Sequence, residues 1–170
     1  MRLFIGLRPS PAFVRALAEL QAQLRRAGVG GRYLSPDNLH LTLAFIGNWP
    51  EDVTALLPPV EEPFPIVLSR VGVFARAKVL WAGVEPSPAL DALAGRVRRN
   101  LDAAEVPYDP QPFKAHITLA RKPVLPREDM LSRIVPPRAE MTVREVCLYK
   151  SERDESGMRY TVIGISGGMS

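Results

Sequence analysis

Two pentapeptides, His40-Leu-Thr-Leu-Ala44 and His116-Ile-Thr-Leu-Ala120, contain the only two histidines of this 170-residue chain. Imidazole has its ordinary pKa near neutral pH, so it exchanges protons readily there. Two imidazoles placed on opposite sides of one bond can act as general acid and general base. The first hypothesis is therefore a catalytic site that uses both histidines.

The pentapeptides belong to a longer internal repeat. A shift of 77 positions aligns residues 3–12 (LFIGLRPSPA) with residues 80–89 (LWAGVEPSPA), and six of these ten positions are identical. A shift of 76 positions then aligns the two pentapeptides. This period exceeds the roughly 20–50 residues of solenoid repeats. Chance similarity between two strands is not expected to include so many prolines and histidines. We expect one bilobal domain over residues 1–170, with the repeat covering about 2–47 and 79–121.

Hydrophobic periodicity and turn residues predict an α+β fold. Ser10-Pro11 and Ser87-Pro88 each combine a serine that can cap a helix with a proline suited to the first helical turn. The last two strands should form a hairpin, and mostly antiparallel sheets covered by helices should result. Residues 50–65 and 122–138, rich in proline and charge, should be surface connections with room for a short helix in each. Besides the pentapeptides, the expected strands are 2–7, 66–74, 79–85, 141–149 and 159–165, and the expected helices run from 11 to Gly28 and from 88 to about 101.

Composition restricts the class of protein without identifying its function. A hydrophobic content of 46% is enough for one core. The single cysteine, Cys147, lies in an apolar run, so we expect a core residue and neither a disulfide, a zinc site nor a thiol nucleophile. The N-terminal apolar stretch is too short for a signal peptide and no segment resembles a membrane span, so the cytoplasm is expected. The net charge of +4 and the excess of arginine over lysine suit an anionic partner, but equally fit a codon or thermophile bias.

The spacing within each pentapeptide places an imidazole beside a hydroxyl. Side chains alternate along a strand, so His40 and Thr42 share one face, as do His116 and Thr118, about 7 Å apart, while the apolar residues face the core. If the two lobes face each other, the four polar groups form a cradle for one phosphate. One imidazole would take a proton from water, the other would give one to the leaving oxygen, and the threonines would bind non-bridging oxygens. A backbone carbonyl is the expected partner of each outer ring nitrogen.

The histidines allow two other interpretations. A single His-x-Thr is usually a polar residue at a sheet edge, but two copies at matching repeat positions favour catalysis. A metal site would need a third ligand at helical or turn spacing, and the sequence has none, so we expect neither a metal nor another cofactor.

These residues resemble a known family. The paired His-x-Thr motifs, the opening Leu3-Phe-Ile-Gly6, Leu80-Trp-Ala-Gly83 and Leu148-Tyr-Lys-Ser151 with Gly157-x-x-Tyr160 are similar to the two-histidine (2H) phosphoesterases. The similarity is greatest to the RNA 2',3'-cyclic phosphodiesterase (2'-5' RNA ligase) branch. The resemblance implies two lobes related by a pseudo-two-fold axis, a central cleft, and metal-independent opening of a 2',3'-cyclic phosphate to a 2'-phosphate. A weaker reverse joining activity is also implied.

The resemblance also assigns roles to single residues. It makes His40 the acid on the 3' oxygen and His116 the base, although a symmetric site can work in either sense. It places Thr42, Thr118 and Arg121 on the phosphate. Simple alternation from His116 turns Arg121 to the opposite face, so Arg121 reaches the cleft only if its strand bulges. Aromatic residues flank both motifs, and Phe45 and Phe113 are candidates for stacking on a base.

The remaining alternatives concern turnover and substrate. A non-catalytic module that binds RNA ends would use the same cleft, and a related esterase would act on another cyclic or 2'-5' linked nucleotide. The expected partners are RNA ends or cyclic nucleotides, and a monomer is expected. Substrate choice should lie in the loops at 28–37, 105–114 and 122–138.

Overall fold

A computed structural model describes residues 1–167 of the chain, and it contains nine strands and two α-helices there. Neither helix is long and apolar enough to cross a membrane. The helices are α1 (Pro11–Arg26) and α2 (Pro88–Ala103), with 3-10 turns η1 (Pro36–Asn38), η2 (Thr54–Leu56) and η3 (Met130–Arg133). The strands are β1 (Arg2–Leu7), β2 (Gly30–Tyr33), β3 (Leu41–Asn48), β4 (Phe64–Phe74), β5 (Val79–Val84), β6 (His116–Val124), β7 (Glu140–Val143), β8 (Cys147–Asp154) and β9 (Gly157–Ile165).

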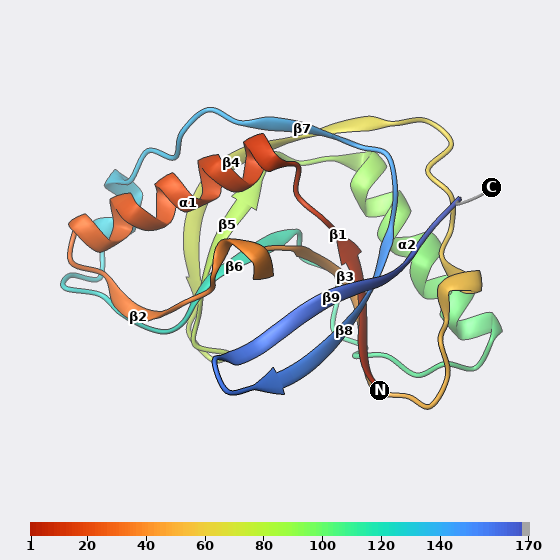
Figure 1. Ribbon diagram of the computed structural model, residues 1–170. Helices are drawn as coiled ribbons and strands as arrows, with labels where there is room; N and C mark the ends of the chain where they lie inside the picture. The colour runs from red at the N-terminus through yellow and green to blue at the C-terminus, as the bar shows by residue number, and fades with distance from the viewer. Residues whose placement is uncertain (168–170) are drawn as a thin grey trace.

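The strands form an antiparallel arrangement whose order is β7-β4-β5-β6-β3-β1-β8-β9, with β2 paired to β6. Two groups of four strands therefore meet at β6 and β3. These two strands are joined through a single registered pair, Leu41 opposite Ile117. The curved sheet and its two helices confirm the expected α+β class (Figure 1).

Each helix is capped at its N-terminus by the expected serine. The Ser10 hydroxyl accepts a hydrogen bond from the Phe13 N–H at 3.2 Å, and the Ser87 hydroxyl accepts one from the Leu90 N–H at 3.1 Å. Both helices present leucine-rich faces to one core that also contains the inward residues of the sheet. Figure 1 shows α1 lying across β4 and β5, on the half of the sheet that does not contain its own preceding strand β1. The fully buried side chains of this core include Phe13, Leu17, Leu20, Leu43, Leu80, Leu93, Leu101 and Leu119.

One predicted strand is wrong. The segment 141–149 is two strands, β7 and β8, which lie at opposite ends of the sheet order. The chain crosses the molecule between them at residues 144–146, where Val146 is fully buried. No glycine or proline marks this crossing, so the apolar pattern continues through it without a turn signal.

The terminal hairpin is confirmed, because β8 and β9 pair antiparallel from Cys147 opposite Ile165 to Asp154 opposite Gly157. Both proline-rich segments are connections, and each contains a 3-10 turn, η2 or η3. The first is not wholly at the surface, because Val53 and Leu57 are buried in the main core. Cys147 is buried, as expected of a core residue. The short strand β2, ahead of the first histidine, was not predicted.

Candidate active site

The junction of β3 and β6 brings the two pentapeptides together. Leu41 and Ile117 occupy the same position in the two copies of the repeat, and they are partners across the junction. The register set by this pair places His40 opposite Thr118 and Thr42 opposite His116. Residues directly opposite in an antiparallel pair have Cβ atoms about 4.5–5.5 Å apart. Each imidazole therefore lies beside the threonine of the other copy, and all four side chains line one cleft.

A bulge in each strand sets the direction of the side chains beyond the motif. In β6, Leu119 has no partner in β5, although Thr118 and Ala120 on either side are paired. In β3, Leu43 likewise has no partner in β1. One extra residue reverses the facing of the side chains beyond it. Arg121 consequently lines the cleft on the same side as the histidines, and the bulge needed for this is present.

The two bulges are held by side chains from the helices. Gln21 of α1, a buried residue, donates 3.0 Å hydrogen bonds to the carbonyls of Leu119 and Leu34. Arg98 of α2 donates to the Leu43 carbonyl at 3.4 Å, and residues 21 and 98 are themselves related by the 77-residue shift. Each helix therefore satisfies a carbonyl of the bulge in the other copy of the motif, which a buried carbonyl requires.

Both imidazoles are oriented by a backbone carbonyl two residues earlier. His40 Nδ1 lies 2.7 Å from the Asn38 carbonyl oxygen, and His116 Nδ1 lies 2.7 Å from the Lys114 carbonyl oxygen. A carbonyl oxygen only accepts, so each Nδ1 carries a proton and each neutral ring has its Nε2 free to accept one. The expected type of partner is thus present in both motifs.

The surroundings of the two rings differ. His40 lies among three aromatic rings, with centroid distances of 4.6 Å to Phe4, 5.6 Å to Tyr149 and 5.1 Å to Tyr160. His116 contacts Phe74 edge-on at 5.0 Å.

Burial lowers the pKa of both imidazoles. For His40 burial is the largest cause and the hydrogen bond to the Asn38 carbonyl opposes it. The charges of Arg121 and then of His116 add to the lowering, and the pKa falls to about 4. For His116 burial is again the main cause, opposed by the hydrogen bond to the Lys114 carbonyl. Both rings are therefore neutral at neutral pH in the free protein. His40, His116 and Arg121 all line the same cleft.

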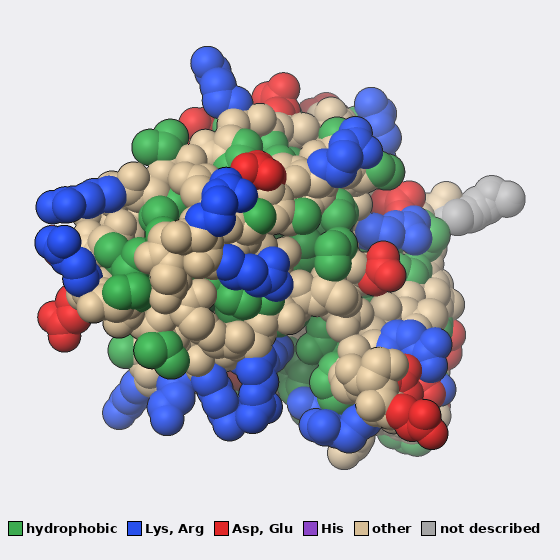
Figure 2. All heavy atoms as spheres, turned by 60° about the vertical axis from the view of Figure 1, so that its left-hand side comes forward, with side chains coloured by type: hydrophobic (Ala, Val, Ile, Leu, Met, Phe, Trp, Pro, Cys, Tyr) green, Lys and Arg blue, Asp and Glu red, His purple; other side chains and the backbone are tan. Residues whose placement is uncertain are grey.

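The cleft that contains these groups has a volume of about 1250 Å³ and is strongly cationic. Asp109 is the single carboxylate among its described lining residues. The ion pairs found in residues 1–167 involve Arg8, Arg26, Arg127, Lys150 and Arg159, and none of these lines the cleft. Figure 2 shows Lys and Arg side chains gathered along the lower edge of the molecule, beside a groove. The cations that line the cleft are Arg2, Arg32, Arg76, Arg98, Lys114, Arg121 and Arg153.

Both predicted aromatic residues line the cleft and are half-buried. Phe45 occupies the repeat position of Arg121, and the Arg2 guanidinium lies 4.9 Å from its ring centroid. Phe113 packs against the main core on its other side.

Two of the three loops expected to govern substrate choice line the cleft, and a role for the third stays a prediction. The loops at 28–37 and 105–114 contribute to the cleft, but the described lining residues include none from 122–138. Their place is taken by the β4–β5 turn at 74–77 and by the tip of the β8–β9 hairpin. The places of that hairpin and of Asn38 in the cleft were not predicted, because the hairpin lies outside the repeat and Asn38 has no matching residue type in the second copy, where Lys114 stands.

Clusters of three or more His, Cys, Asp or Glu side chains that could hold a metal ion are absent from residues 1–167.

Comparison with known proteins places this geometry in context. A model of the 2'-5' RNA ligase superfamily matches residues 9–155. The RNA 2',3'-cyclic phosphodiesterase of Thermus thermophilus is 33% identical, with 96% of this chain and 88% of the relative covered. The enzyme of the same name from Thermotoga maritima is 27% identical, with coverage of 96% and 93%. The crystal structure of E. coli LigT complexed with 3'-AMP superposes with a TM-score of 0.79 at 26% identity, covering 96% of this chain and 95% of that one.

Proposed function

The chain belongs to the 2'-5' RNA ligase superfamily, and we propose on this basis that it is an RNA 2',3'-cyclic phosphodiesterase. Its substrate is the cyclic phosphate at an RNA end and its product is a 2'-phosphate. The single observation that carries the proposal is the pairing of Leu41 with Ile117, which sets two carbonyl-anchored imidazoles and two threonines around one point of a cationic cleft.

The proposed reaction is an in-line displacement at phosphorus. One imidazole accepts a proton from water through Nε2 as the water oxygen bonds to phosphorus. The bond from phosphorus to the 3' oxygen breaks, and the other imidazole, protonated, gives its Nε2 proton to that oxygen. The products are a 2'-phosphomonoester and a 3'-hydroxyl. A 5'-hydroxyl in place of water would give a 2'-5' linkage, which is the proposed weaker joining reaction.

We assign the acid to His40 and the base to His116, following the family resemblance. With a pKa of about 4, His40 is neutral in the free protein at neutral pH. The anionic phosphate must therefore raise this pKa into the neutral range as it binds, a change worth about 4 kcal/mol. Charge neutralisation around a buried phosphate supplies interactions of this size.

The other proposed contacts follow from charge and position. Thr42 and Thr118 donate hydrogen bonds to the non-bridging oxygens, where negative charge increases in the transition state. Arg121 adds a guanidinium that can bind phosphate through two parallel hydrogen bonds. Phe45 and Phe113 offer flat apolar surfaces to a nucleobase or its ribose.

The test is the product formed from a short RNA that ends in a 2',3'-cyclic phosphate, separated from 2'- and 3'-phosphate standards, with and without EDTA. We expect 2'-phosphate in both conditions, loss of activity in His40→Ala and His116→Ala, and full activity in Asp37→Asn as a control. Binding of the RNA without turnover would support the non-catalytic module. Turnover of a different cyclic or 2'-5' linked nucleotide, with this RNA left intact, would support the related esterase.

The acid is identified separately by replacing the 3' bridging oxygen of the substrate with sulfur. A thiolate leaves without a proton, so the variant lacking the acid should recover most of its rate on this substrate, while the variant lacking the base should not. Recovery in His116→Ala but not in His40→Ala would reverse the proposed roles.

A further inference from the structure

The carbonyl that orients His40 lies in η1, outside the strands. This turn has only three residues, and Pro36 and Asp37 are exposed. The backbone hydrogen bond from the Asn38 N–H to the Ser35 carbonyl closes the turn but does not tie it to the sheet. The next residue, Leu39, is buried in the core, and the other contacts that can fix this carbonyl are those of the Asn38 side chain.

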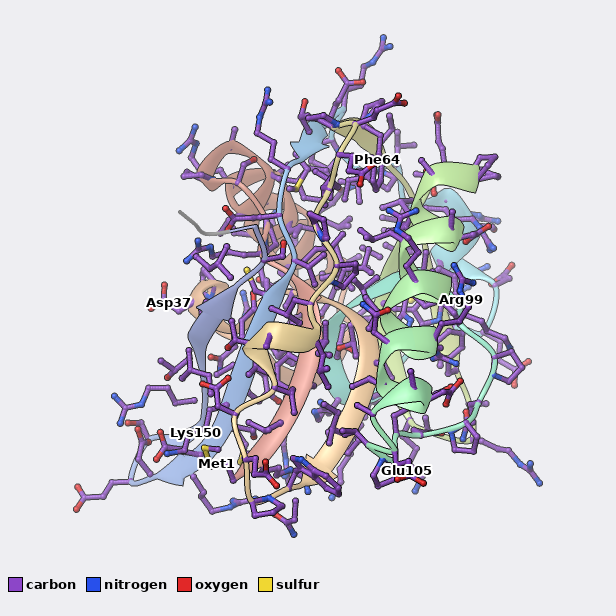
Figure 3. All side chains as sticks on the ribbon, turned by 90° about the vertical axis from the view of Figure 1, so that its right-hand side faces the viewer. Met1, Asp37, Phe64, Arg99, Glu105 and Lys150 are labelled. Atoms are coloured by element: carbon purple, nitrogen blue, oxygen red, sulfur yellow. The ribbon has the colours of Figure 1, made fainter. Side chains whose placement is uncertain are left out.

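The Asn38 side chain supplies these contacts. Its Nδ2 donates to the Met158 carbonyl at 2.8 Å, and its Oδ1 accepts from the Tyr160 N–H at 3.2 Å. Both backbone groups belong to β9, which ends the sheet order. The carbonyl of one residue and the N–H of the residue two later point to the same edge of a strand, so the amide pairs with β9 as a further strand would. Figure 3 shows Asp37, the neighbour of Asn38, beside the β8–β9 hairpin and directed outward.

The same hairpin contacts both the His40 ring and the cleft. Tyr160, whose N–H holds Asn38, places its ring edge-on to His40, and the ring centroid of Tyr149 of β8 lies 5.6 Å from that of the imidazole. Met158 and Arg153, near the hairpin tip, line the cleft. The hairpin is thus connected to His40 by ring contacts and through the Asn38 carbonyl.

The matching residue in the second copy of the repeat is Lys114, which is built differently. Its carbonyl holds His116, but its ammonium group lies 5.7 Å from the Phe74 ring centroid. An amide clamped to a strand edge is thus a feature of the first motif.

We propose that Asn38 is a positioning residue for His40. Its side-chain amide fixes the carbonyl that keeps the proton on His40 Nδ1, and so directs the unprotonated Nε2 to the phosphate. The inference rests on the proposed role of His40 in the reaction. The clamp, meaning the two hydrogen bonds from the Asn38 amide to β9, can also be tested without activity, through the tautomer of His40.

The experiment combines ring nitrogen-15 NMR at neutral pH with steady-state kinetics. The chain has only two histidines, so two imidazoles contribute and a His116→Gln variant assigns them. In the unmodified protein we expect the Nδ1–H form of His40. In Asn38→Ala we expect the Nε2–H form to appear and kcat to fall about 10- to 100-fold, because misplacement by about 1 Å can reduce the rate 100-fold, with KM changed less than about twofold.

Two further variants keep the result interpretable. Asn38→Asp is nearly the same shape and still accepts from the Tyr160 N–H, but it replaces the donor to Met158 with an oxygen that the Met158 carbonyl repels, so a change of the same kind is expected. Asp37→Asn is the matched control and should change neither measurement. The proposal is overturned if His40 keeps the Nδ1–H form in Asn38→Ala, or if kcat is unchanged. If the unmodified protein opens no cyclic phosphate, the proposed function fails, and the tautomer measurement still decides whether the clamp exists.

Discussion

Replacing Gly6 by alanine tests whether the close approach of β1 to β3 positions the site. Gly6 pairs with Thr42, and a Cβ added at Gly6 would lie 2.6 Å from the Leu41 carbonyl oxygen. Ordinary contact begins at 3.4 Å, so the strands must separate by about 0.8 Å. The obstacle is backbone, which cannot rotate away as a side chain would. Leu41 is the residue through which β3 pairs with β6, so the movement falls between the two histidines.

Two effects of different size are expected in Gly6→Ala. Overpacking of this kind reduces the free energy of unfolding by about 1–3 kcal/mol, measurable by urea denaturation. A displacement approaching 1 Å beside Thr42 should lower kcat for cyclic-phosphate opening by about 10- to 100-fold. Gly30→Ala is the matched control, because its Cβ would meet Val124 at an ordinary 3.6 Å. If Gly6→Ala folds with unchanged stability and keeps the rate of the unmodified protein, the close approach does not position the site.

The remaining predictions concern the bulge, the phosphate contact and pH. Gln21→Leu removes the donor to the buried Leu119 carbonyl and to the partly buried Leu34 carbonyl, so stability should fall by about 1–3 kcal/mol and KM should rise as Arg121 moves. If Gln21→Leu leaves both the free energy of unfolding and KM unchanged, Gln21 does not support the bulge. Arg121→Gln should lower kcat/KM by about 10- to 100-fold, the value of a hydrogen-bonded charge, and a rate within twofold of the unmodified protein would remove Arg121 from the site. The pKa of His40 is about 4 in the folded protein and near 6.5 in the unfolded chain. Between these pH values only the unfolded chain binds a proton at His40, so the free energy of unfolding should fall by about 3 kcal/mol as pH drops from 6.5 to 4. His40→Gln should lose that part of the slope, and identical slopes in the two proteins would contradict the burial of His40.

Much of the fold could be predicted because its signals are local. Ser-Pro at each helix start, glycine after α1 and the alternating apolar residues of β1 and β5 each specify a short segment. The split of 141–149 into β7 and β8 could not be predicted in this way. It depends on which strands each part pairs with, and those partners, β4 and β1, lie far away in the sequence.

The site was predicted to a similar extent and for a related reason. The repeated histidines and threonines were identified from their spacing, and the need for a bulge before Arg121 followed from alternation. A backbone carbonyl was expected beside each imidazole, but Gln21 and Asn38 were not predicted, because both side chains act through backbone atoms of strands far away in the sequence. Such contacts leave no pattern in one sequence. The origin of the two halves by duplication stays a prediction.

The two halves of the site share the side chains of the His-x-Thr motifs and differ in the residue that follows each bulge. The histidines, threonines, anchoring carbonyls and bulges are shared by both copies. After the bulge, however, the first copy has Phe45 and the second has Arg121. A tetrahedral phosphate offers similar oxygens to both halves, whereas an RNA end has its nucleoside on one side only. A symmetric site would accept that RNA end in two orientations, with the roles of the histidines exchanged. We therefore expect Phe45 and Arg121, which differ between the two copies, to select one orientation.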